Sequence, residues 1–200
     1  EQRAIIRQKG KNPHLLTMTA TPIPRTIALT LYGDLDLSIL DEMPKGRKYI
    51  KTWLVGPEKR QAAYDWIEKQ LKQTKSQAFI ICPFIEESES MTTVKAATKE
   101  YENLRKIVFP NLKLGMLHGK LKAKEKDKVL QDFRDKKIDI LVATPVVEVG
   151  IDIANATIIL IEGADRFGLS QLHQLRGRVG RGEKQSYCLL FTESRNEQTL

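Results

Sequence analysis

The chain has 200 residues and 41% of them are hydrophobic, which is enough for one globular domain and excludes a wholly disordered chain. Lysine and arginine number 33 against 25 acidic residues, and the net charge of +8 favours an anionic partner such as nucleic acid or a nucleotide. No apolar run approaches the length of a membrane span and no signal peptide is visible, so we expect no membrane partner.

Short apolar runs rich in branched residues alternate with helical patterns along the chain. Several runs, such as FIIC and ILVA, are apolar throughout, which is typical of parallel strands buried on both faces. This alternation predicts an α/β fold with a doubly wound, mostly parallel sheet. The expected strands span residues 15–19, 49–55, 78–82, 114–117, 138–143, 157–161 and 186–192.

Helices are expected between these strands. Pro57 occupies the first-turn position of one of them, and apolar residues follow at the i, i+4 and i+8 spacing of a buried helical face. The others are expected over residues 91–108, 122–134 and 169–178. Ligands of such sheets bind beyond the carboxyl ends of the strands, so the loops after ICPF, MLHG and LVATP are expected to carry the chemistry.

The segment DEMPKGRK combines proline, glycine and charge, as linkers do. It divides a short N-terminal part, residues 1–44, from a compact body, residues 45–200. The chain has no initiator methionine and its last residues resemble a helix start. We therefore expect a piece of a larger protein.

Cysteine and histidine usage favours neither disulfides nor metal sites. Cys82 and Cys188 lie in apolar runs, and we interpret them as reduced core thiols of a cytoplasmic protein. His14, His118 and His173 are far apart and lack the spacing of metal ligands, so no metal site is expected.

The stretch QLHQLRGRVGRG, residues 171–182, is the most informative in the chain. It interleaves Arg176, Arg178 and Arg181 with glycines. A guanidinium is always charged and presents a planar fork of donors, which suits phosphate, and glycine lets the backbone approach a ligand closely. A solvated basic helix end is the alternative that this segment alone leaves open.

Two further segments place small polar residues after expected strands. Thr19 and Thr21, in TATP, have hydroxyls that suit phosphate oxygens, but they equally suit the cap of the following helix. His118, Gly119 and Lys120, in LHGK, precede a basic helix. This turn is a candidate phosphate contact, with a simple solvated turn as the alternative.

In ILVATPVVEVGIDI, Thr144 directly follows an expected buried strand, and Gly150 and Asp152 come shortly after it. The threonine hydroxyl is a candidate donor to a nucleic-acid phosphate, and the aspartate is a candidate acceptor from a ribose hydroxyl. A strand, a turn and a surface acid form the alternative interpretation.

Taken in order, TATP, LHGK, LVATPVVEVGID and QLRGRVGR resemble motifs III, IVa, V and VI of the superfamily 2 helicases and translocases. Longer stretches, such as GADRFGLSQLHQLRGRVGRG, are similar to the RecG family of branched-DNA translocases. The transcription-repair coupling factors share TATPIPRT and QLRGRVGR and are one alternative. A RecA-like lobe that only binds or regulates is another. Pro145 departs from the family pattern, which often has Asp or Thr there, and it removes a backbone donor beside Thr144.

The resemblance implies a RecA-like three-layer α/β domain. Residues 1–44 match the tail of a first motor lobe with its linker, and residues 45–200 match the second, C-terminal lobe. In this family the two lobes close on ATP with Mg²⁺. Arg178 and Arg181 match the positions of the arginine fingers, and Arg176 is expected only to support the helix.

The resemblance also implies roles for the remaining motif residues. The residues expected to bind the nucleotide are Gln174, Gly177, Gly150 and Asp152. The DNA backbone is contacted by Thr144, His118, Gly119 and Lys120. The residues expected to link ATP hydrolysis to contact with the DNA strand are Thr19 and Thr21.

No GxxxxGK[ST] loop and no DExH or DEAD box occurs in these residues. In the family these motifs hold the phosphates and Mg²⁺ and belong to the first lobe, which is therefore an expected partner. ATP hydrolysis is expected of the full-length protein, acting on forked or branched DNA in the bacterial cytoplasm. The 200 residues alone are expected to be inactive, with residues 1–30 mobile or abnormally packed.

Overall fold

The computed structural model describes residues 46–83, 98–145 and 153–193, together with Leu16, Met18 and the short stretches 38–40 and 42–43. The chain falls into two units, Glu1–Leu40 and Asp41–Leu200, and the fold is that of the second. The expected strand at 15–19 and the expected behaviour of residues 1–30 fall almost entirely outside the described residues. The boundary between residues 44 and 45 stays a prediction.

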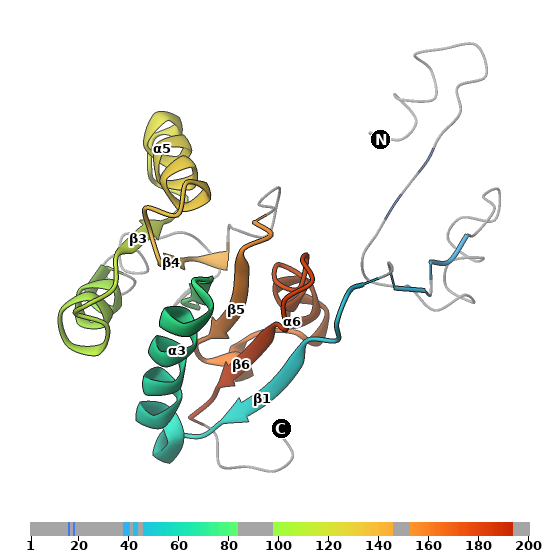
Figure 1. Cartoon of the computed structure of the whole chain (residues 1–200), viewed down its shortest axis with the longest axis horizontal. Coiled ribbons are helices and arrows are strands. Elements are labelled where there is room, and N and C mark those ends of the chain that lie inside the picture. The colour runs from blue at the N-terminus through green and yellow to red at the C-terminus, as the bar shows by residue number, and fades with distance from the viewer. Residues whose placement is uncertain are drawn as a thin grey trace. The chain divides into compact units, whose positions relative to one another are not determined.

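Within the described residues, six strands form one sheet in the order β1-β6-β5-β2-β4-β3 (Figure 1). Every pair of neighbours is parallel. The α/β fold with a mostly parallel sheet is confirmed, and each of these strands lies within two residues of its expected bounds. The strands are β1 (Lys51–Val55), β2 (Gln77–Ile81), β3 (Leu114–Leu117), β4 (Ile140–Ala143), β5 (Ala156–Ile161) and β6 (Tyr187–Phe191).

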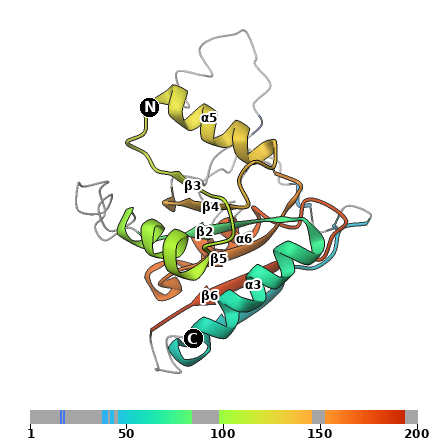
Figure 2. The same ribbon diagram turned by 60° about the vertical axis from the view of Figure 1, so that its left-hand side comes forward.

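Helices cover both faces of this sheet and make a three-layer domain (Figure 2). One face carries α3 (Arg60–Thr74), which follows the 3-10 turn η1 (Pro57–Lys59). The same face carries η2 (Leu104–Val108), a π-helical continuation of the helix that the structure describes from residue 98. The opposite face carries α5 (Ala123–Arg134) and α6 (Leu169–Arg176), the latter preceded by the 3-10 turn η4 (Ala164–Arg166).

Alternate residues of the central strands point to opposite faces, so the sheet supports two separate apolar cores. The side chains listed here are all buried. On one face Ile80, Val142 and Leu160 pack with Ile67 and Leu71 of α3, and on the other Phe79, Leu141 and Ile159 pack with Phe133 of α5 and Leu175 of α6.

The helix expected over residues 169–178 is shorter than predicted, because α6 ends at Arg176. Gly177 caps it, and the Arg178 N–H donates to the Leu175 carbonyl at 2.9 Å. Gly180 then has φ of +74°, a conformation that glycine adopts without steric penalty. The two glycines stop the helix, so Arg178 lies in a loop and not on a helix face.

Phe133→Ala should lower the free energy of unfolding by about 3–5 kcal/mol. The ring is fully buried, and its centroid lies 5.2 Å from that of Phe79. Leu169→Ala is the matched control, because Leu169 is 86% exposed and its truncation should change stability by less than about 0.5 kcal/mol. Urea unfolding followed by circular dichroism measures both, and equal effects would contradict the packing of α5 on the sheet.

Candidate functional site

The residues singled out by the sequence lie at two opposite edges of the sheet. His118 and Thr144 directly follow β3 and β4, at the carboxyl edge. Since β5 and β6 are parallel, the chain returns to the amino edge between them, and α6 makes that return. The loop after α6 therefore lies at the amino edge, where Arg47, just before β1, donates to the Gly180 carbonyl at 2.6 Å.

The loops beyond the strands' carboxyl ends, where the sequence predicts the chemistry, hold only part of the predicted site residues. That prediction locates the LHGK turn and Thr144, but it does not locate Arg178 and Arg181. The arginine pair follows a helix that runs antiparallel to the strands, so it emerges at the opposite edge.

At the carboxyl edge, Thr144 and the LHGK turn lie side by side. The Thr144 N–H donates to the Leu117 carbonyl at 3.2 Å, next to the register pair Leu117↔Ala143. The Thr144 side chain is 1% exposed, and its hydroxyl has no hydrogen-bond partner among the described residues. A buried hydroxyl without a partner costs about 1–3 kcal/mol, so it marks a position where a ligand oxygen would restore the lost bond.

The LHGK turn is fixed to the first turn of α5. The Leu121 N–H donates to the His118 carbonyl at 3.2 Å, and Lys126 Nζ donates to the Gly119 carbonyl at 2.6 Å. His118 and Gly119 are half-buried, whereas Lys120 is exposed. The turn therefore presents a lysine beside the positive end of a helix, a setting that attracts anions.

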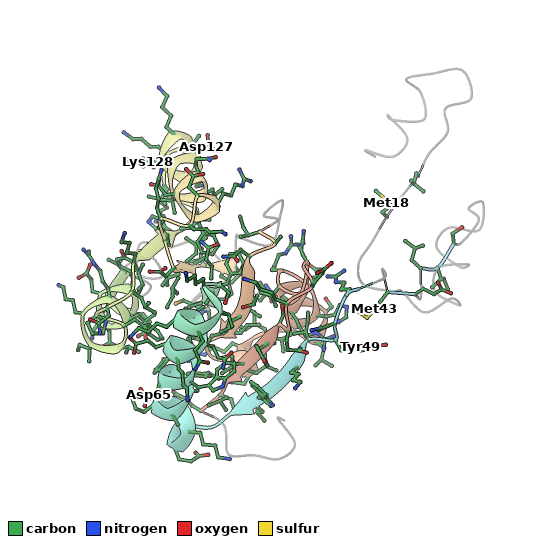
Figure 3. The ribbon with its side chains drawn as sticks, in the orientation of Figure 1. Met18, Met43, Tyr49, Asp65, Asp127 and Lys128 are labelled. Carbon is green, nitrogen blue, oxygen red and sulfur yellow. The ribbon has the colours of Figure 1, made fainter. Side chains whose placement is uncertain are left out.

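The first turn of α5 also carries an acid. The Glu125 carboxylate accepts a hydrogen bond from the Lys122 N–H at 2.9 Å and so caps the helix. Further along, Asp127 and Lys128 project from the outer side of α5, away from the sheet (Figure 3). The helix is thus of mixed charge, with acidic residues between its lysines.

The arginine loop is held together by short-range contacts. Arg181 is exposed, and its Nε donates to the Gly177 carbonyl at 3.3 Å, while Arg178 is half-buried. A Cβ added at Gly182 would lie 3.2 Å from the Ala154 carbonyl oxygen. The end of the loop therefore lies against the segment that leads into β5.

The last turn of α6 contributes two more of the residues expected from the sequence. Arg176 lies next to His173, with its Nη2 atom 3.0 Å from Nδ1. Gln174 is half-buried, and its carbonyl oxygen would be 3.3 Å from a Cβ added at Gly177. The structure thus brings Gln174, Gly177 and Arg181 together at the end of one helix.

Four of the expected site residues, Thr19, Thr21, Gly150 and Asp152, lie outside the described residues. Their roles stay predictions. Ile153, which follows Asp152 in the sequence, is buried, and its carbonyl accepts a hydrogen bond from the Ala156 N–H at the start of β5.

Sequence reasoning missed a charged cluster at the carboxyl edge. Glu162 directly follows β5 and is 8% exposed. Its carboxylate accepts hydrogen bonds from Arg60 Nη1 at 2.8 and 3.1 Å and from the Tyr64 hydroxyl at 2.9 Å. The Arg60 guanidinium also lies 4.9 Å from the centroid of the Phe191 ring. An acid immediately after the apolar run ATIILI was the available signal.

Burial dominates the electrostatics of this cluster. It raises the pKa of Glu162, against the attraction of Arg60, which lowers it. The pKa values of Tyr64 and of Cys82 also lie above their usual ranges. Burial is the larger cause and the negative charge of Glu162 is the next. Burial also raises the pKa of Cys188 to about 12. Both thiols are buried and stay protonated at neutral pH, which confirms their assignment to the core.

The described parts of the chain hold no group of three or more His, Cys, Asp or Glu that is placed to bind a metal ion. None of the helices in those parts is both long and apolar enough to cross a membrane.

The family of the chain follows from a domain-wide match. Residues 58–183 match the helicase conserved C-terminal domain. The chain belongs to this family. As a helicase C-terminal domain, it is 53% identical to the ATP-dependent DNA helicase RecG of Synechocystis sp. and 51% identical to that of Bacillus subtilis. Each match covers 98% of this chain but only 23% and 29% of the respective relative, so the chain spans about a quarter of their length.

Solved structures give the same result for the fold of this helicase domain. A structure of RecG bound to a three-way DNA junction is 46% identical, with a TM-score of 0.73, over 90% of this chain and 23% of that one. Saccharomyces cerevisiae Dbp5 bound to RNA and ADP BeF3 is 18% identical, with a TM-score of 0.62, over 96% and 48%. The second match shows the shared fold alone. Both the RecA-like fold and the resemblance to RecG inferred from the motifs are confirmed.

Arg60→Met should lower the free energy of unfolding by about 3 kcal/mol near neutral pH, because it leaves the buried Glu162 carboxylate without its cation. The value is at the low end for such pairs, since the Arg60 side chain is 30% exposed. Burial persists in the variant while the attraction is lost, so the pKa of Glu162 rises further. A carboxyl group whose pKa is raised in the folded state costs stability as the pH rises and the group becomes charged. The difference in the free energy of unfolding between wild type and Arg60→Met should therefore be smaller at about pH 5 than at about pH 7.

Denaturant unfolding of wild type and variant across that pH range measures this deficit. Lys72→Met is the control, because it breaks an exposed pair with Glu68 and should cost less than about 1 kcal/mol. A deficit of constant size from about pH 7 to about pH 5 would show that Glu162 is not the group responsible.

Proposed function

We propose that the chain is the second motor lobe of a RecG-type ATP-dependent DNA helicase or translocase, which remodels stalled forks and other branched DNA in repair and recombination. The observation that carries the proposal is the match, at 46% identity and a TM-score of 0.73, to RecG bound to a three-way DNA junction. The identity of 51–53% to RecG helicases over 98% of the chain supports it. The relatives are bacterial, and we place the full-length protein in the bacterial cytoplasm.

On this proposal, Arg178 and Arg181 act as arginine fingers at the amino edge. They face ATP, whose phosphates and Mg²⁺ are held mainly by the first motor lobe. Negative charge spreads over the transferring phosphoryl oxygens, and a positioned guanidinium stabilises it, which contributes about 10³–10⁵ in rate or about 4–7 kcal/mol. The hydrogen bond from Arg181 to Gly177 and the packing of Gly182 on Ala154 support this role, because they restrict the loop before ATP arrives.

The nucleotide side is completed by Gln174 and Gly177 at the end of α6. Gly150 and Asp152 belong to it as well, with Asp152 accepting from the ribose. Their support comes from the match of their motifs and, for Gln174 and Gly177, from their place beside Arg181.

At the carboxyl edge, we assign Thr144, His118, Gly119 and Lys120 to the DNA backbone. The Thr144 N–H already donates to Leu117, and Pro145 has no N–H, so the Thr144 hydroxyl is the donor that the end of β4 offers to a phosphate. Contacts to phosphates carry no sequence information and release counterions. DNA binding should therefore be indifferent to sequence and steeply salt-dependent.

Thr19 and Thr21 complete the proposal as the residues that link hydrolysis to strand contact. Placing DNA and ATP at opposite edges makes this linkage a physical requirement. The strands between the edges have 4 to 6 residues, which corresponds to roughly 13–20 Å. A signal between the two sites must cross the lobe.

Arg178→Ala in the full-length protein should lower kcat for DNA-stimulated ATP hydrolysis by about 10³-fold or more, because the developing phosphoryl charge loses its cation. The Kd for ATP should stay nearly unchanged, since other groups hold the phosphates. Arg176→Ala is the matched control, because Arg176 contacts His173, and it should keep most of the turnover. Steady-state hydrolysis and fluorescent-nucleotide titration measure the two quantities, and an equal loss of both would make Arg178 structural.

Thr144→Val should weaken DNA binding and DNA-stimulated hydrolysis while the Tm stays the same or rises. Valine keeps the shape of the side chain and removes a hydroxyl that has no partner among the described residues. Thr157→Val is the control, because the Thr157 hydroxyl donates to Ser76 at 2.8 Å, and it should lower the Tm without affecting DNA binding. Fluorescence anisotropy with forked DNA and thermal unfolding test the pair, and unchanged DNA affinity in Thr144→Val would remove Thr144 from the interface.

A further inference from the structure

A buried amide at the amino edge joins segments that have different proposed tasks. Gln77 is the first residue of β2 and is 2% exposed. Its Nε2 donates to the Phe133 carbonyl at 2.6 Å, near the end of α5, and to the Ile138 carbonyl at 2.7 Å, just before β4. Its Oε1 accepts from Asn155 Nδ2 at 3.1 Å. One side chain thus connects the end of α5 to the start of β5.

Asn155 extends this connection to the arginine loop. Its backbone carbonyl accepts from the Gln77 N–H at 3.0 Å, so the two residues are joined twice. Its Oδ1 accepts from Lys184 Nζ at 3.3 Å, and Lys184 follows the arginine loop in the chain. The preceding residue, Ala154, is the one against which Gly182 packs. Asn155 therefore lies where the loop meets the segment that enters β5.

Helix α5 joins these hydrogen bonds to the proposed DNA contact at the carboxyl edge. α5 begins beside the LHGK turn, which Lys126 holds at 2.6 Å, and it ends one residue after the carbonyl that Gln77 holds. Its 12 residues span roughly 18 Å, about the distance between the two edges of the sheet. A helix is a rigid element, so movement at its first turn is carried to its last turn.

A neighbouring set of hydrogen bonds serves stability without this connection. The Thr157 hydroxyl donates to Ser76 at 2.8 Å, and Ser76 shares a hydrogen bond of 2.6 Å with Thr74. This set joins α3 to β5 and includes no atom of α5. A variant that removes the Thr157 hydroxyl therefore loses a buried polar contact of β5 but keeps the hydrogen bond between Gln77 and α5.

We propose that Gln77, acting through Asn155, is the positioning residue that couples DNA contact on the start of α5 to the placement of the arginine loop. The inference rests on the proposed function and deepens it by assigning the route between its two sites. When DNA shifts α5, the carbonyl of Phe133 moves with it, whereas the carbonyl of Ile138 belongs to the segment that enters β4. The amide follows the Phe133 carbonyl, and Asn155 passes the displacement to Lys184 and the loop.

The test uses the full-length protein and compares Gln77→Met, Asn155→Ala and Thr157→Val with wild type. Methionine matches the length of glutamine without its hydrogen bonds. Asn155→Ala keeps the bond from Gln77 to Phe133 of α5, and it removes the side-chain bonds that Asn155 makes with Gln77 and Lys184. The measured quantities are kcat for ATP hydrolysis with and without saturating forked DNA, the Kd for that DNA, and the Tm.

Gln77→Met and Asn155→Ala should each lower the ratio of DNA-stimulated to basal kcat by at least about fivefold, the lower range of allosteric coupling. Basal kcat and the Kd for DNA should change by less than about twofold, because neither residue is assigned to ATP or DNA contact. Thr157→Val should keep the ratio despite a lower Tm. Since Asn155 is only half-buried, its variant carries the test if Gln77→Met does not fold.

Two results would overturn the inference: an unchanged ratio in Asn155→Ala, or an equal fall of the ratio in Thr157→Val. Both are measured against a wild type that DNA stimulates. A wild-type protein whose hydrolysis does not respond to DNA would instead contradict the proposed function itself.

Discussion

The strands of the sheet all run in one direction, and this constraint decides where each candidate residue lies. In a parallel sheet every connection carries the chain from the carboxyl edge back to the amino edge. Residues that end a strand, such as Thr144, therefore lie at one edge, and residues that end a returning helix, such as Arg178, lie at the other. On the proposed function, the DNA site and the nucleotide site of this lobe would therefore not overlap.

Two helices on one face of the sheet, α5 and α6, each run from the carboxyl edge to the amino edge, and the proposed function requires both of these connections. α5 starts at the LHGK turn and ends beside Gln77, and α6 ends at the glycine that releases the arginine loop. Both helices pack on the same apolar core, with Phe133 and Leu175 fully buried. Close packing resists small independent shifts, so a displacement of one helix is felt across that core.

Three buried polar side chains show three different physical situations. The Gln77 amide has its donors and its acceptor engaged, and the Glu162 carboxylate is paired with Arg60 and Tyr64. Both contribute to the stability of the lobe because their desolvation is offset by hydrogen bonds. The Thr144 hydroxyl, in contrast, has no partner in the described part of the chain, and it stands beside the turn that we assign to DNA. The contrast separates two groups that serve the fold from the one that we propose for the DNA backbone.

The sequence by itself determined the α/β class and the strands from residue 49 onward, because branched apolar runs and their spacing are local signals. The order of its motifs also indicated the helicase family, and the family match confirms it. The roles of Thr19, Thr21, Gly150 and Asp152 stay predictions. Only the tertiary structure decided that α6 stops at Arg176 and that the arginine loop and Thr144 occupy opposite edges. It alone placed Gln77 against carbonyls 56 and 61 residues away, because a hydrogen bond to a distant backbone oxygen leaves no pattern in the neighbouring sequence.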